Sequence, residues 1–109
     1  MDWRTQAQAE INHAEQARAR GNEGLARVCA RRAGGFVARE YFTRQGLTIH
    51  TSSAYDLLIA LTEDRSLPDE LRRSAKYLTL RVNEEFKLPV DVDLISEAKK
   101  LCRELIKER

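Results

Sequence analysis

The chain has 109 residues, 42% of them hydrophobic and 33% charged, and its formal net charge is +2. This length and composition fit one folded domain over residues 1–109 and exclude a disordered or low-complexity chain. No apolar run approaches the roughly 18 residues that span a bilayer, and the start MDWRTQAQAE lacks the features of a signal peptide, so we expect a cytoplasmic protein with no membrane partner.

Five helices and no strand are expected in chain order. The first runs from an N-cap at Asp2 to about Arg20, with its apolar side chains on one stripe. Gly21 ends it as the C′ residue, and Asn22 caps a second helix that stops at Gly46. Because the turn between them is tight, these two helices are expected to pack as an antiparallel hairpin.

A Gly34-Gly35 pair lies near the middle of the second helix, where two glycines cost about 2 kcal/mol relative to alanine. Close approach of another helix is the usual reason for small residues at such a place. We expect that approach either within the core or at a dimer seam. The apolar arc of this helix is expected to contain Leu25, Cys29, Ala33, Phe36 and Val37.

Arginine outnumbers lysine by 14 to 5 in the chain, and the second helix carries much of this excess. Four of its arginines are expected to face outward as candidate ligand-binding or partner-binding residues: Arg27, Arg31, Arg32 and Arg39. Their guanidinium groups suit phosphate or an acidic partner protein. The alternative is a solvated helix face with no ligand.

Ser53 is expected to cap a third helix, and Ser66–Glu70 is a helix-start signal with proline and acidic residues in the first turn. The fourth helix is expected to continue until shortly before Pro89. Its apolar stripe is expected to contain Leu71, Ala75, Leu78, Val82 and Phe86. Tyr77 and Leu80 lie on a second side of this helix and are candidates for close packing or a dimer seam.

Asp91 or Asp93 is expected to cap the last helix. Cys29 and Cys102 fall on apolar helix faces, so we expect them to be small core residues and not reactive thiols. The two histidines are isolated in the sequence and supply no metal-ligand spacing. We therefore expect neither a metal ion nor a cofactor.

The tryptophan near the start, the alanine-rich first hairpin and the segment ARRAGGFVAREYFTRQG resemble a HEPN domain, the higher eukaryote and prokaryote nucleotide-binding domain. The resemblance covers nearly the whole chain in helix order and length, and Arg39 stands where the second helix of the family usually has lysine. It implies an all-α, up-and-down bundle of four to five helices. Other positions that fit the family pattern are Ala30, Ala33, Ala38, Gly46 and the run Asp56-Leu57-Leu58.

The chain departs from the family pattern at several positions. Arg31 and Arg32 replace glutamines, and Gly35 replaces a glutamate. Ser52 stands where a histidine is usual. HEPN ribonucleases place a histidine shortly after an arginine, because RNA cleavage needs a group that exchanges protons near neutral pH. Arg81 is at the matching place, but no histidine follows it.

The resemblance therefore implies a non-catalytic binding module that forms a homodimer and acts with a minimal nucleotidyltransferase subunit. Its role would be nucleotide binding, substrate binding or that of a toxin–antitoxin partner. One alternative is a HEPN-type RNase toxin with a degenerate active site that acts on RNA, in which Arg81 and Glu85 are weak catalytic candidates. A second alternative is a helical scaffold or adaptor that binds no nucleotide.

Overall fold

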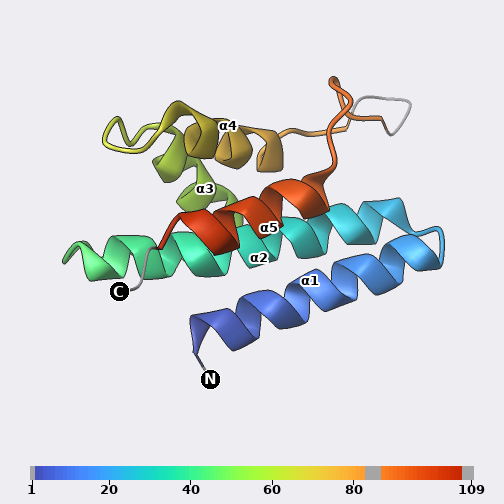
Figure 1. Ribbon diagram of the computed structural model, residues 1–109, viewed down its shortest axis with the longest axis horizontal. Coiled ribbons are helices and arrows are strands. Elements are labelled where there is room, and N and C mark those ends of the chain that lie inside the picture. The colour runs from blue at the N-terminus through green and yellow to red at the C-terminus, as the bar shows by residue number, and fades with distance from the viewer. Residues whose placement is uncertain (1, 83–86, 107–109) are drawn as a thin grey trace.

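The computed structural model describes residues 2–82 and 87–106. Those two stretches contain no strand and fold into five α-helices: α1 (Trp3–Ala19), α2 (Glu23–Arg44), α3 (Ala54–Thr62), α4 (Asp69–Leu78) and α5 (Leu94–Glu104). Figure 1 shows α2 in the middle of the bundle, with α1 antiparallel to it on one side and with α3 and α4 on the other. α5 packs against both α2 and α4. The predictions of an all-α bundle and of an antiparallel first hairpin are confirmed.

The ends of the helices follow from local sequence. Gly21 follows α1 with a φ of 79°, a backbone conformation that glycine adopts without strain. This turn lets the backbone N–H of Asn22 donate to the carbonyl of Ala17, at 2.8 Å, so the chain reverses within a few residues. The predicted N-caps at Asp2, Asn22 and Ser53 are confirmed, because a side-chain oxygen of each accepts a backbone N–H from the first turn. Of the two candidates for the last helix, Asp93 is the cap.

Small side chains dominate the buried face of α2, because this helix contacts all four of the others. The sequence placed Leu25 on that face, but its side chain is 38% exposed and Ala26 is buried instead. The buried arc is thus rotated by one residue at the start of α2. Alanine fits there because α1 lies close against α2 immediately after the tight turn.

Gly34 and Gly35 lie where α2 meets the second half of the chain. A Cβ atom added to Gly35 would stand 2.6 Å from the Cβ of Ala54 and 2.9 Å from its Cα, at the start of α3. A Cβ atom on Gly34 would stand 3.0 Å from Leu78 Cδ1 and 3.1 Å from Leu58 Cδ2. Both glycines are buried, and the close approach that the sequence predicted is made within one chain.

The fourth helix is shorter than predicted, because α4 ends at Leu78. The guanidinium group of Arg31 donates from Nε to the carbonyl of Leu78, at 2.8 Å, and from Nη2 to the carbonyl of Leu80, at 3.1 Å. A side chain from α2 thus satisfies carbonyls that another turn of helix would otherwise use. Val82, predicted on the apolar stripe, is 40% exposed. Phe86, the last residue of that predicted stripe, lies outside the described residues.

Arg18 forms ion pairs that connect the start of α2, just after the turn, with the start of α5. Its Nη2 donates to Glu23 Oε2 at 2.7 Å, and its Nη1 lies 3.0 Å from Asp93 Oδ1. The hydrogen bond from Arg18 lowers the pKa of Glu23 below its ordinary value. Partial burial acts to raise the pKa of Asp93, but the hydrogen bonds from Arg18 and Ser96 outweigh it and lower that pKa as well.

Replacing Arg18→Gln is expected to lower the free energy of unfolding by about 1 kcal/mol near neutral pH, the usual contribution of ion pairs that water partly screens. Because both carboxyl pKa values are lowered in the folded state, this stabilisation is present above their ordinary values of 3.8 and 4.5. It is lost as the pH falls through the folded-state values. Urea unfolding near pH 7 and near pH 2 measures the difference in stability between the wild type and Arg18→Gln. Arg20→Gln, an exposed arginine at the end of the same helix, is the control. An equal loss in the control, or a difference that persists in acid, would contradict this assignment.

Candidate functional site

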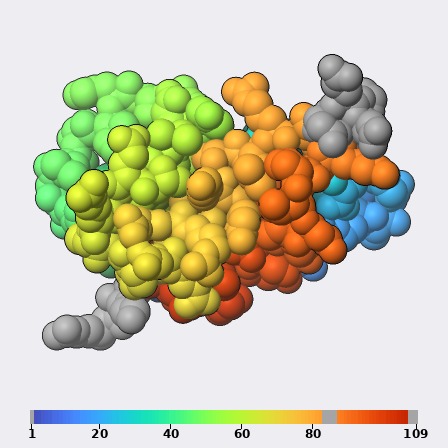
Figure 2. All heavy atoms as spheres, turned by 90° about the horizontal axis from the view of Figure 1, so that it is seen from above, coloured from blue at the N-terminus to red at the C-terminus, as the bar shows by residue number. Residues whose placement is uncertain are grey.

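A cleft of about 720 Å³ lies between the start of α2 and the segment that follows α4. In Figure 2, orange surface from the part of the chain between α4 and α5 lies beside the blue-to-cyan surface that includes the start of α2. The residues from α2 that line the cleft include Arg27 and Arg31, and the segment after α4 contributes Arg81. Val28 and Val82, both exposed, supply apolar surface in the same cleft. The cleft is therefore basic and partly apolar.

Arg31 is held in place by the backbone. Two of its three guanidinium nitrogens donate to the carbonyls of Leu78 and Leu80, so the group has little freedom to rotate. Among the described residues, the third nitrogen, Nη1, has no hydrogen-bond partner. Its two N–H donors remain for a ligand.

Arg81 contacts an aromatic ring and lies near enough to Arg31 for its charge to act there. The guanidinium carbon of Arg81 lies 5.3 Å from the centroid of the Tyr55 ring on α3, within the range of a cation–π contact. The pKa of Arg31 is lowered, first by its burial and then by the positive charge of Arg81. Two like charges held close together repel each other, and an anion placed between them removes that repulsion. This arrangement is complementary to a phosphate or another oxyanion.

The four arginines predicted on α2 do not share one surface. Arg27 and Arg31 line the cleft, and Arg31 turns inward to the end of α4 where the sequence predicted that it faces out. Arg32 and Arg39 are exposed and line a separate hollow of about 340 Å³ against Glu10. Nη2 of Arg39 also donates to the carbonyl of Thr51, in the connector before α3. The basic character predicted for α2 is therefore divided between two places.

Known proteins provide no assignment for this site. No family model, curated protein or solved structure matches the chain. The helices and their contacts establish the all-α fold. The HEPN resemblance stays a prediction made from the sequence.

The other predicted site residues lie near the end of α4. Tyr77 is partly buried against the core, and Leu80 lines the cleft while its carbonyl accepts from Arg31. Glu85, a weak catalytic candidate, lies outside the described residues. Sequence reasoning missed Tyr55 and missed the pairing of Arg31 with Arg81. No signal in the sequence brings these three residues together, because each belongs to a different segment and only the packing of α2, α3 and α4 unites them.

The cysteines and acidic residues suggest no metal site. Cys29 is buried in the core, as predicted, and burial raises the pKa of its thiol. Over residues 2–82 and 87–106, no group of three or more histidine, cysteine or acidic side chains is placed to hold a metal ion. None of the helices in these stretches is both long enough and apolar enough to cross a membrane.

Proposed function

We propose that this chain is a non-catalytic binding module of HEPN-like architecture, and that the cleft beside α2 takes a phosphate-bearing group such as a nucleotide. The observation that carries the proposal is the pair of guanidinium groups on Arg31 and Arg81, each held by a different part of the chain. Groups that are fixed before a ligand arrives lose little conformational freedom on binding.

The chemistry of the described cleft favours binding over catalysis. General acid–base catalysis needs a group that exchanges a proton near neutral pH, whereas arginine keeps its charge. The one acid among the described lining residues is Glu23, which accepts hydrogen bonds from Arg18 and has a lowered pKa. A carboxylate in that state is a poor proton acceptor. An anion held by arginines alone is bound and oriented.

The proposal includes a homodimer and a minimal nucleotidyltransferase partner, both of which rest on the HEPN resemblance. The exposed side chains of Val28 and Val82 support it, because they place apolar surface next to the charged groups of the cleft. Apolar surface beside a polar site is a common property of protein interfaces. In this arrangement the partner would cover the cleft and share the bound nucleotide.

Replacing Arg81→Ala is expected to weaken the binding of ATP or inorganic pyrophosphate about tenfold, the effect of losing one charge-assisted hydrogen bond. Arg81 is a better residue than Arg31 for this test. Arg81 is exposed, whereas Arg31 also donates hydrogen bonds to the end of α4. Isothermal titration calorimetry measures this change in affinity. Added salt should also weaken the binding of the anion to the wild type. Arg73→Ala, an exposed arginine on α4 outside the cleft, is the matched control.

Five outcomes would overturn the proposal or part of it. The binding site would be ruled out if the wild-type protein did not bind either anion at millimolar concentration. Equal losses of affinity in Arg81→Ala and Arg73→Ala would rule it out as well. A monomer by light scattering at micromolar concentration, or purification from its own host without a nucleotidyltransferase, removes the assembly. Cleavage of RNA by the purified protein that Arg81→Ala abolishes would favour the RNase alternative.

A further inference from the structure

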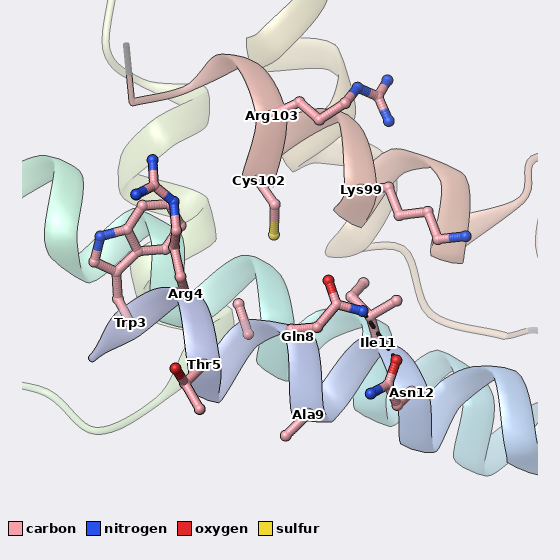
Figure 3. Close-up of a pocket in the computed structure, with 11 residues that line it drawn as sticks. Trp3, Arg4, Thr5, Gln8, Ala9, Ile11, Asn12, Lys99, Cys102 and Arg103 are labelled. Atoms are coloured by element: carbon pink, nitrogen blue, oxygen red, sulfur yellow. Dashed lines mark hydrogen bonds between the residues drawn. The ribbon is translucent and has the colours of Figure 1, made fainter. Parts of the chain in front are cut away.

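A second hollow, a groove of about 780 Å³, lies between α1 and α5. Figure 3 shows the thiol of Cys102 pointing from α5 toward α1, with Trp3 and Arg4 at one end of the groove. Ala7 and Ile11 lie at its floor, where their side chains are only 2% and 3% exposed. The floor is thus apolar and recessed below the surface.

Two ion pairs between described residues join α1 to α5 on the side of the groove away from Trp3. Ion pairs join Arg18 to Asp93 and Lys99 to Glu15, the second with 2.9 Å between Lys99 Nζ and Glu15 Oε1. The first contact lies at the end of α1 and the start of α5, and the second lies near the middle of α5. Farther along, the side chains that face the gap include Ala7 and Cys102, which are too small to fill it.

The rim of the groove is positively charged. Its lining contains Arg4, Lys99 and Arg103, and no carboxylate is among the described residues that line it. Lys99 also pairs with Glu15, outside the lining. The side chain of Arg103 is 65% exposed, and its Nη2 lies 4.0 Å from Glu104 Oε2. Because an exposed ion pair contributes little free energy, Arg103 can turn toward a ligand at little cost. Arg103 is therefore the rim cation that an anion can most readily draw away from its partner.

Cys102 contributes apolar surface to this floor. Burial raises the pKa of its thiol to about 11, in spite of the positive charge on Arg103. The thiol is therefore protonated and uncharged at neutral pH, and it behaves as a small apolar group. The groove combines an uncharged apolar floor with a cationic rim.

We propose that this groove binds an amphipathic organic anion, with its apolar body over Ala7, Ile11 and Cys102 and its carboxylate against Arg103 and Lys99. The volume lies within the range of about 300–1,000 Å³ that is usual for small-molecule sites. The proposal is independent of the cleft that contains Arg31 and Arg81, because the two hollows share no lining residue.

The position of the apolar surface favours a small molecule over a bilayer. A protein surface that inserts into a bilayer presents large hydrophobic side chains that protrude from it. None of the described large hydrophobic residues that are exposed lies on this rim, since they are Leu25, Val28, Leu47, Val82 and Val90. A free molecule with a narrow apolar chain is the occupant that reaches the recessed floor.

The single tryptophan of the chain, Trp3, lines the groove and reports on its occupancy. Decanoate is expected to change the fluorescence of Trp3 in a saturable way, with a dissociation constant on the order of 100 µM, and to give the same constant by calorimetry. Decanol, which lacks the charge, and butyrate, which lacks the long chain, are each expected to bind at least about tenfold more weakly.

Two variants test the two halves of the site. Arg103→Gln removes a rim charge from an exposed position and is expected to weaken decanoate binding about threefold to tenfold. Cys102→Phe fills the groove and is expected to abolish binding, with circular dichroism to show that the protein stays folded. Arg73→Gln, on α4, is the control for charge, and Arg81→Ala should leave decanoate binding unchanged.

Several results would overturn the inference. The first is the absence of decanoate binding at millimolar concentration. The others are an affinity for decanol equal to that for decanoate, and an Arg103→Gln variant that binds decanoate as tightly as the wild type. Association with anionic vesicles but not with free decanoate would replace the small-molecule site with a membrane surface. If Cys102→Phe does not fold, the rim variant and the decanol comparison still decide the question.

Discussion

Gly35→Ala is expected to lower the free energy of unfolding by about 2–3 kcal/mol, although alanine is the better helix former by about 1 kcal/mol. The added Cβ atom would stand 2.6 Å from the Cβ of Ala54 and 2.9 Å from its Cα. Because one of these atoms belongs to the backbone, no side-chain rotation relieves the overlap. The start of α3 must therefore move away from α2.

Two other glycines of α2 provide matched controls for that experiment. A Cβ atom on Gly24 would meet only Asn22 Oδ1, at 3.8 Å, so Gly24→Ala should raise the free energy of unfolding by about 0.5 kcal/mol. Gly34→Ala should fall between the two, because the atoms that it meets are the ends of leucine side chains that can shift. Urea unfolding of the three variants measures the order of their stabilities. A Gly35→Ala protein as stable as wild type would contradict the close packing of α2 and α3.

Arg31→Met is expected to lower the free energy of unfolding by about 2–3 kcal/mol, because hydrogen bonds from a charged donor are worth more than neutral ones. The substitution leaves the carbonyls of Leu78 and Leu80 without the donors that close α4. It also removes one of the two guanidinium groups of the cleft, so it should weaken the binding of pyrophosphate by at least about tenfold. Chemical unfolding and calorimetry measure the two effects on the same protein.

Comparison with two further variants separates geometry from charge in that result. Arg31→Lys keeps the charge but loses the planar fork that reaches two carbonyls at once, so it should recover only part of the stability. Arg32→Met changes the next residue, which is exposed, and should alter stability by no more than about 0.5 kcal/mol. Faster amide hydrogen exchange around Thr79–Val82 is expected in Arg31→Met alone. Equal stability of Arg31→Met and Arg32→Met would rule out this role for Arg31.

The double role of Arg31 links the fold to the proposed site. The bonds that end α4 also orient a guanidinium group toward the cleft, and the same early end of the helix frees the segment that contains Arg81. A continuous helix up to Phe86, as the sequence predicted, would present Arg81 on a regular helix surface. The basic cleft is therefore a consequence of where α4 stops.

The amino-acid sequence is enough to predict features that depend on neighbouring residues. The all-α class and the N-caps at Asp2, Asn22, Ser53 and Asp93 were readable because capping and helical periodicity act over a few residues. The turn at Gly21 belongs to the same group.

Features that depend on contacts between distant segments are set by the packing of the folded chain. The end of α4, the inward turn of Arg31, the partner that approaches Gly35 and the position of Arg81 against Tyr55 all arise from the packing of α2, α3 and α4. Periodicity marks a side chain as apolar or charged, but it does not specify which distant atom that side chain meets. A charged residue on a helix is for that reason read from sequence as solvent-facing, even where a carbonyl elsewhere in the chain holds it.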